Sequence, residues 1–254
     1  MKTVAIIQAR MGSQRLAGKV LRTLCGKTML AHVLERVSAA KRLDEVWLAT
    51  SVNPQNDELA LHVEALGYPC FRGSEEDVLA RYHGAAQAAQ ADVIVRITSD
   101  CPLYDPLVCD RMLERFHAAL GENPPADFMS SVFERRFPRG LDTEIFTFAA
   151  LDRNFREALL PNEREHVTPH FYHHPEKFRA LSWVNEEDLS LFRWTVDTPE
   201  DWQFIETVYE KLWRPGHVIT TQEVVALLAQ FPELAAVNAE VEQKYSAEQK
   251  LTAK

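Results

Sequence analysis

The alternation of short apolar runs with amphipathic segments constrains the fold more than any other feature of the chain. Residues 4–7 (VAII) form an uninterrupted apolar run, which is typical of a strand buried on both faces of a parallel sheet. Residues 28–40 carry apolar side chains at helical spacing. Further strands are predicted at residues 45–50, 69–71 and 92–97. Further helices are predicted at residues 57–66 and 77–89, and another is predicted to begin at Asp105-Pro106. This order predicts an α/β fold with a Rossmann-like, mainly parallel sheet and helices on both faces.

The second half of the chain is less regular, and we predict that it elaborates the same domain, which spans residues 1–254. Turn-forming residues at 121–126 (GENPPA) interrupt the alternation. We expect a smaller α+β elaboration over residues 126–190, with possible strands at 128–132, 144–146 and 178–184. Residues 193–196 are predicted to return to the sheet as a strand, and a helix is predicted to begin at Thr198-Pro199. Residues 220–254 are predicted to form a helical tail that frays after Glu233.

The charge and the cysteine content exclude several classes of protein. The chain has 28 Lys and Arg against 37 Asp and Glu, a formal net charge of −9, which argues against a general binder of nucleic acids or anionic membranes. The four cysteines lack C-x-x-C and zinc-ribbon spacing, so we expect them to be reduced and buried. We see no secretory signal and no apolar run near the ~18 residues of a membrane helix. We therefore expect a cytoplasmic protein.

The segment that follows the first predicted strand is the strongest candidate for a binding site. Residues 8–19 (QARMGSQRLAGK) contain three cations and two glycines: Arg10, Arg15, Lys19, Gly12 and Gly18. Cations and free backbone N–H groups at the carboxyl end of a strand suit an anion such as a polyphosphate. The glycines enclose five residues and Val20 follows Lys19, so the segment is not a Walker A loop, and G-x-G-x-x-G is also absent. A solvated basic loop stays open as the alternative.

Two aspartates come after later predicted strands. Asp100, in residues 98–102 (TSDCP), directly follows the strand at 92–97, where a carboxylate suits Mg²⁺. A turn aspartate is an equal alternative at this position. Asp197 follows the predicted returning strand, and it would complete a metal site if it converged on Asp100. Its alternative is an aspartate that interacts with the dipole of the next helix. Asp105 is expected to cap a helix.

The histidine-rich segment 163–174 gives a weaker signal. His166 and His170 are four residues apart, but Pro169 lies between them and breaks a continuous helix. The motif H-E-x-x-H is absent, so a zinc site on this pair is disfavoured. Packing, or contact with an anionic acceptor, is favoured instead. We find no Ser-His-Asp arrangement and no G-x-S-x-G.

Together these segments resemble the cytidylyltransferases that make CMP-sugars. Residues 6–30 (IIQARMGSQRLAGKVLRTLCGKTML) look like the N-terminal signature of that family, which includes CMP-Kdo synthetases and acylneuraminate cytidylyltransferases. Residues 96–103 (RITSDCPL) resemble the R-x-T-G-D-C-P-L block of the branch that contains the spore-coat polysaccharide protein SpsF. Residues 140–144, 163–168 and 196–201 resemble further blocks of that branch. The resemblance runs over nearly the whole chain.

The resemblance implies a nucleotide-diphospho-sugar transferase fold and a reaction in which CTP and a sugar hydroxyl give a CMP-sugar and pyrophosphate. It implies Mg²⁺ as cofactor and a small sugar acid as acceptor, either a nonulosonate or another ketosugar acid. A sugar phosphate or polyol phosphate of a surface polysaccharide stays open as the alternative acceptor. It also implies a role in surface polysaccharide biosynthesis and a homodimer whose interface lies in the 126–190 elaboration. No nucleic-acid or membrane partner is expected.

The resemblance further implies roles for individual residues. The expected catalytic residues are Arg10, Lys19 and Asp100, and the expected metal ligands are Asp100 and Asp197. The expected nucleotide-binding residues are Ala9, Arg10, Met11, Gly12, Arg15, Lys19 and Ser99. The expected acceptor-binding residues, in the elaboration, are Asp142, Glu144 and His166.

Two positions depart from the family pattern. Ser99 replaces the usual Gly before the metal aspartate, and Ala17 replaces the usual Pro in R-L-P-G-K. A positive φ at Ser99 would cost about 1–2 kcal/mol. Neither change removes a charge, so we expect activity. Two other functions stay open: a glycosyltransferase of similar fold, although residues 100–102 are not D-x-D, and a non-catalytic nucleotide- or sugar-binding module. Release of pyrophosphate from CTP distinguishes them.

Overall fold

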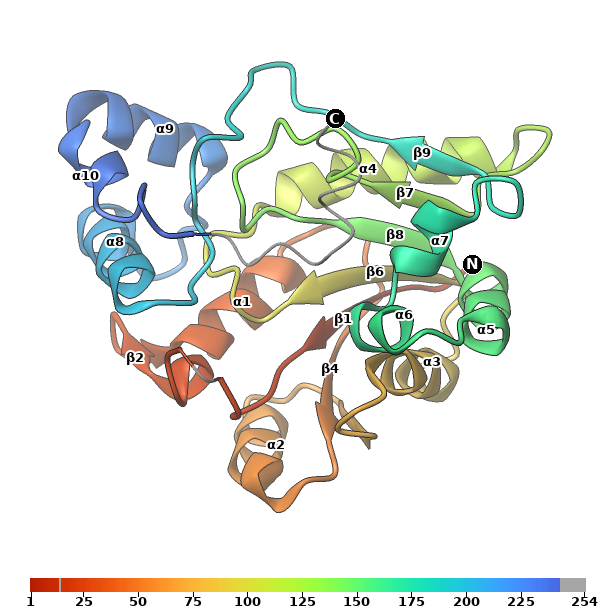
Figure 1. Ribbon diagram of the computed structural model, residues 1–254. Coiled ribbons are helices and arrows are strands. Elements are labelled where there is room, and N and C mark those ends of the chain that lie inside the picture. The colour runs from red at the N-terminus through yellow and green to blue at the C-terminus, as the bar shows by residue number, and fades with distance from the viewer. Residues whose placement is uncertain (14, 243–254) are drawn as a thin grey trace.

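A seven-stranded sheet runs through the centre of the molecule (Figure 1). The computed structural model describes residues 1–13 and 15–242, and the strand order in this sheet is β5-β4-β1-β6-β8-β7-β9. The strands are β1 (Thr3–Gln8), β4 (Glu45–Ser51), β5 (Cys70–Gly73), β6 (Val93–Thr98), β7 (Phe128–Ser130), β8 (Glu144–Thr147) and β9 (Ala180–Ser182). Only β8 runs antiparallel to its neighbours in this sheet. The predicted mainly parallel α/β sheet is confirmed.

Helices cover both faces of the sheet and enclose two cores. One core receives α1 (Met29–Ser38), α2 (Asp57–Ala65), α4 (Pro106–Leu120), α8 (Pro199–Leu212) and α9 (Thr221–Gln230). The other receives α3 (Val78–Ala88), α5 (Phe148–Glu157) and α7 (Pro169–His173). Strand β1 supplies both cores, because Ala5 and Ile7 face one while Val4 and Ile6 face the other. This explains why the run at residues 4–7 is apolar throughout.

Local capping signals place several helix starts where the sequence predicts them. The Asp105 carboxylate accepts a hydrogen bond from the Leu107 N–H at 2.9 Å, with Pro106 in the first turn of α4. Thr198 and Asp201 form a capping box at the start of α8. Thr220 and Glu223 form another at the start of α9.

The predicted returning strand at residues 193–196 is wrong. This segment makes one isolated bridge, between Arg193 and Arg139, and the Val196 N–H donates to the Asp100 carbonyl at 2.8 Å. The reason is that β8 already pairs with β6 on the side away from β1. The segment therefore runs past the end of β6 instead of joining the sheet.

Several short elements were not predicted. Strands β2 (Thr23–Leu24) and β3 (Lys27–Thr28) form a separate two-stranded hairpin, and α6 (Pro161–His166) joins α5 and α7 in the second half of the chain. The 126–190 segment adds β7, β8 and β9 to the central sheet, and its boundaries as an elaboration stay a prediction. Helix α10 (Glu233–Ala236) begins the predicted polar tail, and residues 243–254 of that tail lie outside the described residues.

In the part of the chain that the structure describes, no helix has both the length and the hydropathy to cross a membrane.

Candidate active site

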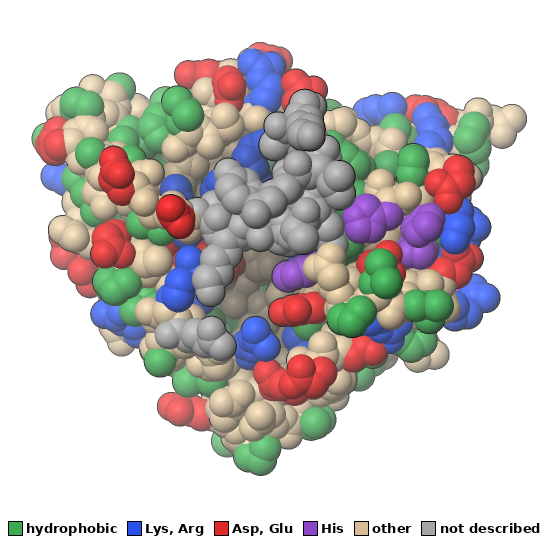
Figure 2. Space-filling view, viewed as in Figure 1, with side chains coloured by type: hydrophobic (Ala, Val, Ile, Leu, Met, Phe, Trp, Pro, Cys, Tyr) green, Lys and Arg blue, Asp and Glu red, His purple; other side chains and the backbone are tan. Residues whose placement is uncertain are grey.

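A cleft of about 940 Å³ opens at the carboxyl ends of β1 and β6. This is where parallel α/β sheets place their ligands. Figure 2 shows a hollow near the centre of the face drawn, with acidic and basic side chains around it. The cleft is lined by these residues of the predicted site: Ala9, Arg10, Gly12, Arg15, Lys19, Ser99, Asp100, His166 and Asp197. Segments from both halves of the chain therefore meet in one cleft.

Lys19 lies between the two aspartates. Its Nζ is 3.4 Å from Asp100 Oδ2 and 2.9 Å from Asp197 Oδ1, and it donates to the Val196 carbonyl at 2.5 Å. Gly18 adopts a φ of 64°, which turns the chain into a 3-10 helix that begins at Lys19. Burial alone would lower the pKa of Lys19, but the charges of Asp100 and Asp197 outweigh it and raise the pKa above its ordinary value. Lys19 therefore stays protonated at neutral pH.

Asp197 accepts contacts from three cations. Besides Lys19, the Nη2 of Arg15 lies 2.9 Å and the Nη2 of Arg193 lies 3.1 Å from Asp197 Oδ2. Burial would raise the pKa of Asp197, but these charges outweigh it and hold the pKa below its ordinary value. The carboxylate is therefore ionised, and its oxygens lie beside the positions predicted to bind phosphate.

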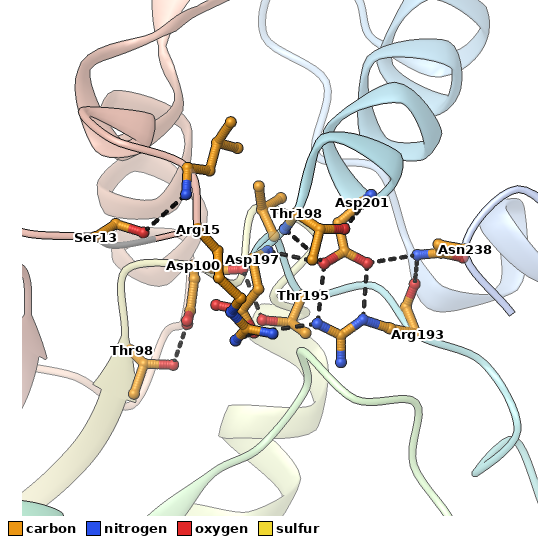
Figure 3. Close-up of polar contacts among 12 residues, drawn as sticks. Ser13, Arg15, Thr98, Asp100, Arg193, Thr195, Asp197, Thr198, Asp201 and Asn238 are labelled. Atoms are coloured by element: carbon orange, nitrogen blue, oxygen red, sulfur yellow. Dashed lines mark hydrogen bonds and ion pairs between the residues drawn. The ribbon is translucent and has the colours of Figure 1, made fainter. Parts of the chain in front are cut away.

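A buried network behind Asp197 fixes its position (Figure 3). Arg193 donates from Nε and Nη2 to the two oxygens of Asp201, at 2.7 Å and 2.9 Å. Asp201 Oδ2 also accepts the backbone N–H groups of Asp197 and Thr198, at 2.9 Å and 3.0 Å. Asn238 donates to Asp201 Oδ1 at 3.0 Å and to the Arg193 carbonyl at 2.8 Å. Sequence reasoning missed this network, although Asp201 belongs to the T-P-E-D capping pattern at residues 198–201.

Asp100 has its own local support. Thr98, the last residue of β6, donates from Oγ1 to Asp100 Oδ1 at 2.6 Å (Figure 3). The Asp100 carbonyl accepts the Val196 N–H and, at 3.2 Å, the Thr195 hydroxyl. The strain considered for Ser99 does not arise, because the described non-glycine residues with positive φ are Cys25, Gln90 and Val167.

Charged residues from α3, α6 and the loop before α3 complete the cleft. Among them are Glu75, Asp77, Arg81, Arg164 and Glu165. The Arg10 Nη1 lies 3.4 Å from Glu75 Oε1, and the Arg164 Nε lies 3.0 Å from Asp77 Oδ2. Sequence reasoning missed these residues because it searched the ends of strands. The block at residues 163–168 was the available signal, and only His166 was taken from it.

Three predicted site residues have other contacts. Glu144 is 5% exposed and accepts from Arg96 Nη1 at 2.5 Å and from the Tyr172 hydroxyl. Its side chain thus joins β8 to β6, which argues against the predicted acceptor contact. Asp142 accepts from Arg135 at 2.6 Å and 3.1 Å, and it is not among the described residues that line the cleft. The Met11 N–H donates to Asn56 Oδ1 at 2.8 Å, and the Met11 side chain packs against the core.

The predicted break at Pro169 is confirmed and separates the two histidines. Helix α6 ends at His166, and α7 begins at Pro169. His166 lines the cleft, whereas His170 is buried with its Nδ1 3.2 Å from Glu163 Oε1. The two side chains therefore do not form a shared site.

The cleft brings basic and acidic side chains into contact with one another. Arg10, Arg15 and Lys19 are each within 3.4 Å of a carboxylate oxygen. An anionic ligand could draw the cations away from these partners, and the carboxylates would then be free to bind a metal ion that accompanies the anion. The arrangement suits binding and charge neutralisation of a polyphosphate.

Comparisons with known proteins agree on one family. A family model described as cytidylyltransferase matches residues 4–240. The spore coat polysaccharide biosynthesis protein SpsF of Bacillus subtilis is 34% identical over 238 residues, which cover 91% of this chain and 95% of that protein. A 3-deoxy-manno-octulosonate cytidylyltransferase of Chlamydia trachomatis is 30% identical over 186 residues, 68% of each chain. The solved structure of a cytidylyltransferase from Leptospira borgpetersenii superposes with a TM-score of 0.87 at 32% identity, covering 97% of this chain and all of that one.

Proposed function

The chain belongs to the cytidylyltransferase family, and we propose that it transfers CMP from CTP to a hydroxyl group of a small sugar acid, with release of pyrophosphate. The observation that carries this proposal is the placement of Lys19 between Asp100 and Asp197 in the cleft that Arg10 and Arg15 also line. Such an arrangement suits nucleotidyl transfer, because this chemistry depends on positioning and on neutralising phosphate charge.

We propose a sugar acid as acceptor and a role in surface polysaccharide biosynthesis. One relative is named for 3-deoxy-manno-octulosonate, which is a sugar acid, and another for spore coat polysaccharide biosynthesis. Arg164 and His166, both on α6, line the cleft and would suit the carboxylate of such an acceptor. The homodimer and the cytoplasmic location stay predictions.

We propose Mg²⁺ as cofactor, with Asp100 and Asp197 as its protein ligands. The donor set fits, since two carboxylates already converge on one cationic nitrogen, that of Lys19, and oxygen ligands suit Mg²⁺. When bound, Mg²⁺ would neutralise phosphate charge and orient the triphosphate.

The residues of the chain have separable tasks in this proposal. Arg10 and Arg15 hold phosphate oxygens, and the arginine fork suits two-point contacts. When the triphosphate binds, Lys19 moves from the two carboxylates to the phosphate oxygens. There it stabilises the negative charge that develops as the acceptor oxygen attacks the α-phosphorus and pyrophosphate departs. The network of Arg193, Asp201 and Asn238 keeps the Asp197 backbone in place throughout.

Nucleotide binding tests the first part of the proposal. Calorimetry with CTP, UTP, ATP and GTP, each with and without Mg²⁺, is expected to show Mg²⁺-dependent binding that favours CTP. Arg10→Ala should weaken CTP binding by about tenfold or more, since it removes a charged contact to phosphate. Arg115→Ala is the matched control, because Arg115 pairs with Glu122 at an exposed site outside the cleft. Equal loss in both variants would contradict the placement of the triphosphate.

Turnover tests the second part. Pyrophosphate release from CTP should require an acceptor, and sugar acids should support it while neutral sugars do not. Binding of a nucleotide sugar without binding of CTP would favour a glycosyltransferase. Binding of CTP and Mg²⁺ without turnover on any of a panel of sugar acids, sugar phosphates and polyol phosphates would favour a binding module.

A further inference from the structure

A cluster of imidazole and carboxylate groups joins α6 and α7. Glu163, His170 and His174 each place one potential ligand atom within 4.8 Å of the other two. Glu163 lies on α6, His170 lies on α7, and His174 follows the last residue of α7. Histidine side chains gather at the surface over α7 (Figure 2), and the His174 side chain is 33% exposed, so an ion could reach the cluster past His174. None of the three residues belongs to the described lining of the active-site cleft.

His170 carries a buried nitrogen whose hydrogen-bonding capacity is unused. His170 is 3% exposed, and its Nδ1 lies 3.2 Å from Glu163 Oε1. In a neutral imidazole, Nδ1–H donates to this carboxylate, so the lone pair is on Nε2. That Nε2 has no hydrogen-bond partner among the described residues. Buried polar atoms are rarely left unpaired, so this one requires an explanation.

A carboxylate and a second imidazole lie near His170 Nε2. Glu157, the last residue of α5, has its Oε2 3.8 Å from this nitrogen, which is too long for a hydrogen bond. The same Oε2 accepts from Lys177 Nζ at 2.9 Å, at a site open to solvent. A lone pair and a carboxylate oxygen thus face each other across a short gap. The ring of His174 is tilted against the ring of His170, with 4.2 Å between the centroids. Its Nδ1 lies 3.0 Å from Glu176 Oε1, so its Nε2 is the nitrogen left for an ion.

We propose that His170 and His174, together with the carboxylates of Glu157 and Glu163, form a binding site for a divalent transition-metal ion of the zinc class. Two imidazoles and a carboxylate are the ligands that Zn²⁺ prefers, whereas Mg²⁺ prefers oxygen ligands and keeps water. A histidine that donates Nδ1–H to a carboxylate while Nε2 faces the ion is the usual arrangement around such metals. Glu163 would orient His170. Glu157 would supply the acidic ligand by exchanging its contact with Lys177 for one with the ion.

The site would have a structural task. It would tie the end of α5 to α6 and α7, and α6 carries Arg164 and His166 into the cleft. The break at Pro169 is what allows this, since it turns α7 so that His170 meets Glu163.

Metal binding to the full-length, tag-free chain tests the proposal. After treatment with EDTA and dialysis into reducing buffer, titration with ZnCl₂ and elemental analysis should show about one bound ion per chain. His174→Gln and His170→Gln should each weaken binding by about tenfold or more. Zn²⁺ should raise the melting temperature of the wild type and not that of His174→Gln. Millimolar Mg²⁺ should leave Zn²⁺ binding unchanged.

Two controls make the result decisive. His217→Gln removes an exposed histidine that pairs with Glu223, away from the cluster, and should bind Zn²⁺ as the wild type does. Asp197→Asn should also leave Zn²⁺ binding unchanged, because that carboxylate belongs to the cleft. His174 is only half-buried, so its variant is expected to fold even where His170→Gln is unstable. Absence of binding in the wild type, or equal binding in the wild type and His174→Gln, would overturn the proposal.

Discussion

Arg193 shows how a residue behind the cleft shapes its chemistry. Its guanidinium holds both oxygens of Asp201, and the same Asp201 accepts the backbone N–H of Asp197. Burial would lower the pKa of Arg193, but Asp201 and Asp197 outweigh it and raise the pKa. Arg193 therefore stays charged, and its planar guanidinium holds Asp201 through two hydrogen bonds. A lysine keeps the charge and loses the two-point geometry.

We therefore expect Arg193→Lys to lower the free energy of unfolding by about 1–3 kcal/mol, because a buried charged hydrogen bond is lost. Turnover of CTP should fall as well, since Asp197 loses its support. Urea unfolding and a pyrophosphate-release assay measure the two effects. Arg115→Lys, at an exposed ion pair with Glu122, should change stability by less than about 0.5 kcal/mol. A similar change in both variants would argue against the buried network.

The Cys70 thiol gives a pH-dependent prediction. Burial, and then the charge of Glu64, raise the pKa of Cys70 to about 11. The reactive form is the thiolate, so iodoacetamide labelling of Cys70 should rise about tenfold per pH unit from pH 8 to pH 10. Peptide mapping by mass spectrometry at each pH measures the rate. An ordinary cysteine has a pKa of about 8.5, so a rate that levels off near pH 9 would contradict this environment.

At the scale of elements, the segment before Asp197 is held by another loop and not by the sheet. The Arg139 N–H donates to the Phe192 carbonyl at 3.0 Å, and the Trp194 N–H donates to the Arg139 carbonyl at 2.7 Å. Gly140 lies at this crossing with a φ of 106°. A Cβ there would lie 2.7 Å from the Trp194 carbonyl carbon and 2.8 Å from the Thr195 nitrogen. The crossing therefore requires glycine.

We expect Gly140→Ala to cost more than about 2 kcal/mol of unfolding free energy, because an unfavourable φ and a backbone clash add together. Activity should fall too, since Thr195 and Val196 both bond to the Asp100 carbonyl. Gly216→Ala is the control: its φ is 76°, but a Cβ there would have no heavy atom within 4 Å. The free energy of unfolding of Gly216→Ala should fall by only about 1–2 kcal/mol. Chemical denaturation of both variants gives the comparison, and equal losses would show that the crossing is not tight.

At the scale of the whole molecule, the cleft is assembled from segments that the chain order separates widely. Lys19 and Asp197 are 178 positions apart. Strand β1 contributes to both cores, the loop after it packs against one of them, and α8, which follows Asp197, packs into that same core. A ligand that bridges these segments binds the folded chain and not the unfolded one.

Binding of CTP with Mg²⁺ should therefore stabilise the fold. At a CTP concentration of about 100 times Kd, the expected gain is about 2.7 kcal/mol. For a chain of this size that corresponds to a rise in Tm of roughly 5–10 °C. Differential scanning fluorimetry measures the shift. EDTA and Asp197→Asn should each remove most of it, whereas an undiminished shift in EDTA would argue against a metal held by Asp100 and Asp197.

The first half of the fold and the basic loop were predictable from the sequence for a physical reason. Apolar periodicity, capping residues such as Asp105 and Thr198, and the glycines at 12 and 18 act over a few neighbouring positions, and these are adjacent in the sequence. Parallel strands also share one functional edge, so the sequence predicts that the loop after β1 and Asp100 after β6 lie at the carboxyl ends of their strands. The strand predicted at residues 193–196 rested on the same short-range pattern. Its apolar residues are buried, as they would be in a strand, but the segment does not pair with the sheet.

The sequence by itself thus determined the alternation of strands and helices, the helix starts and the charge of the loop after β1. Only the tertiary structure decided which distant partner each polar side chain meets. Glu144 could have faced a ligand, and it pairs with Arg96 because β8 lies antiparallel beside β6. The same holds for the Arg193 network and for the cluster at His170. Such contacts depend on how the elements pack, and sequence spacing carries no direct record of a distance between residues that are far apart in the chain.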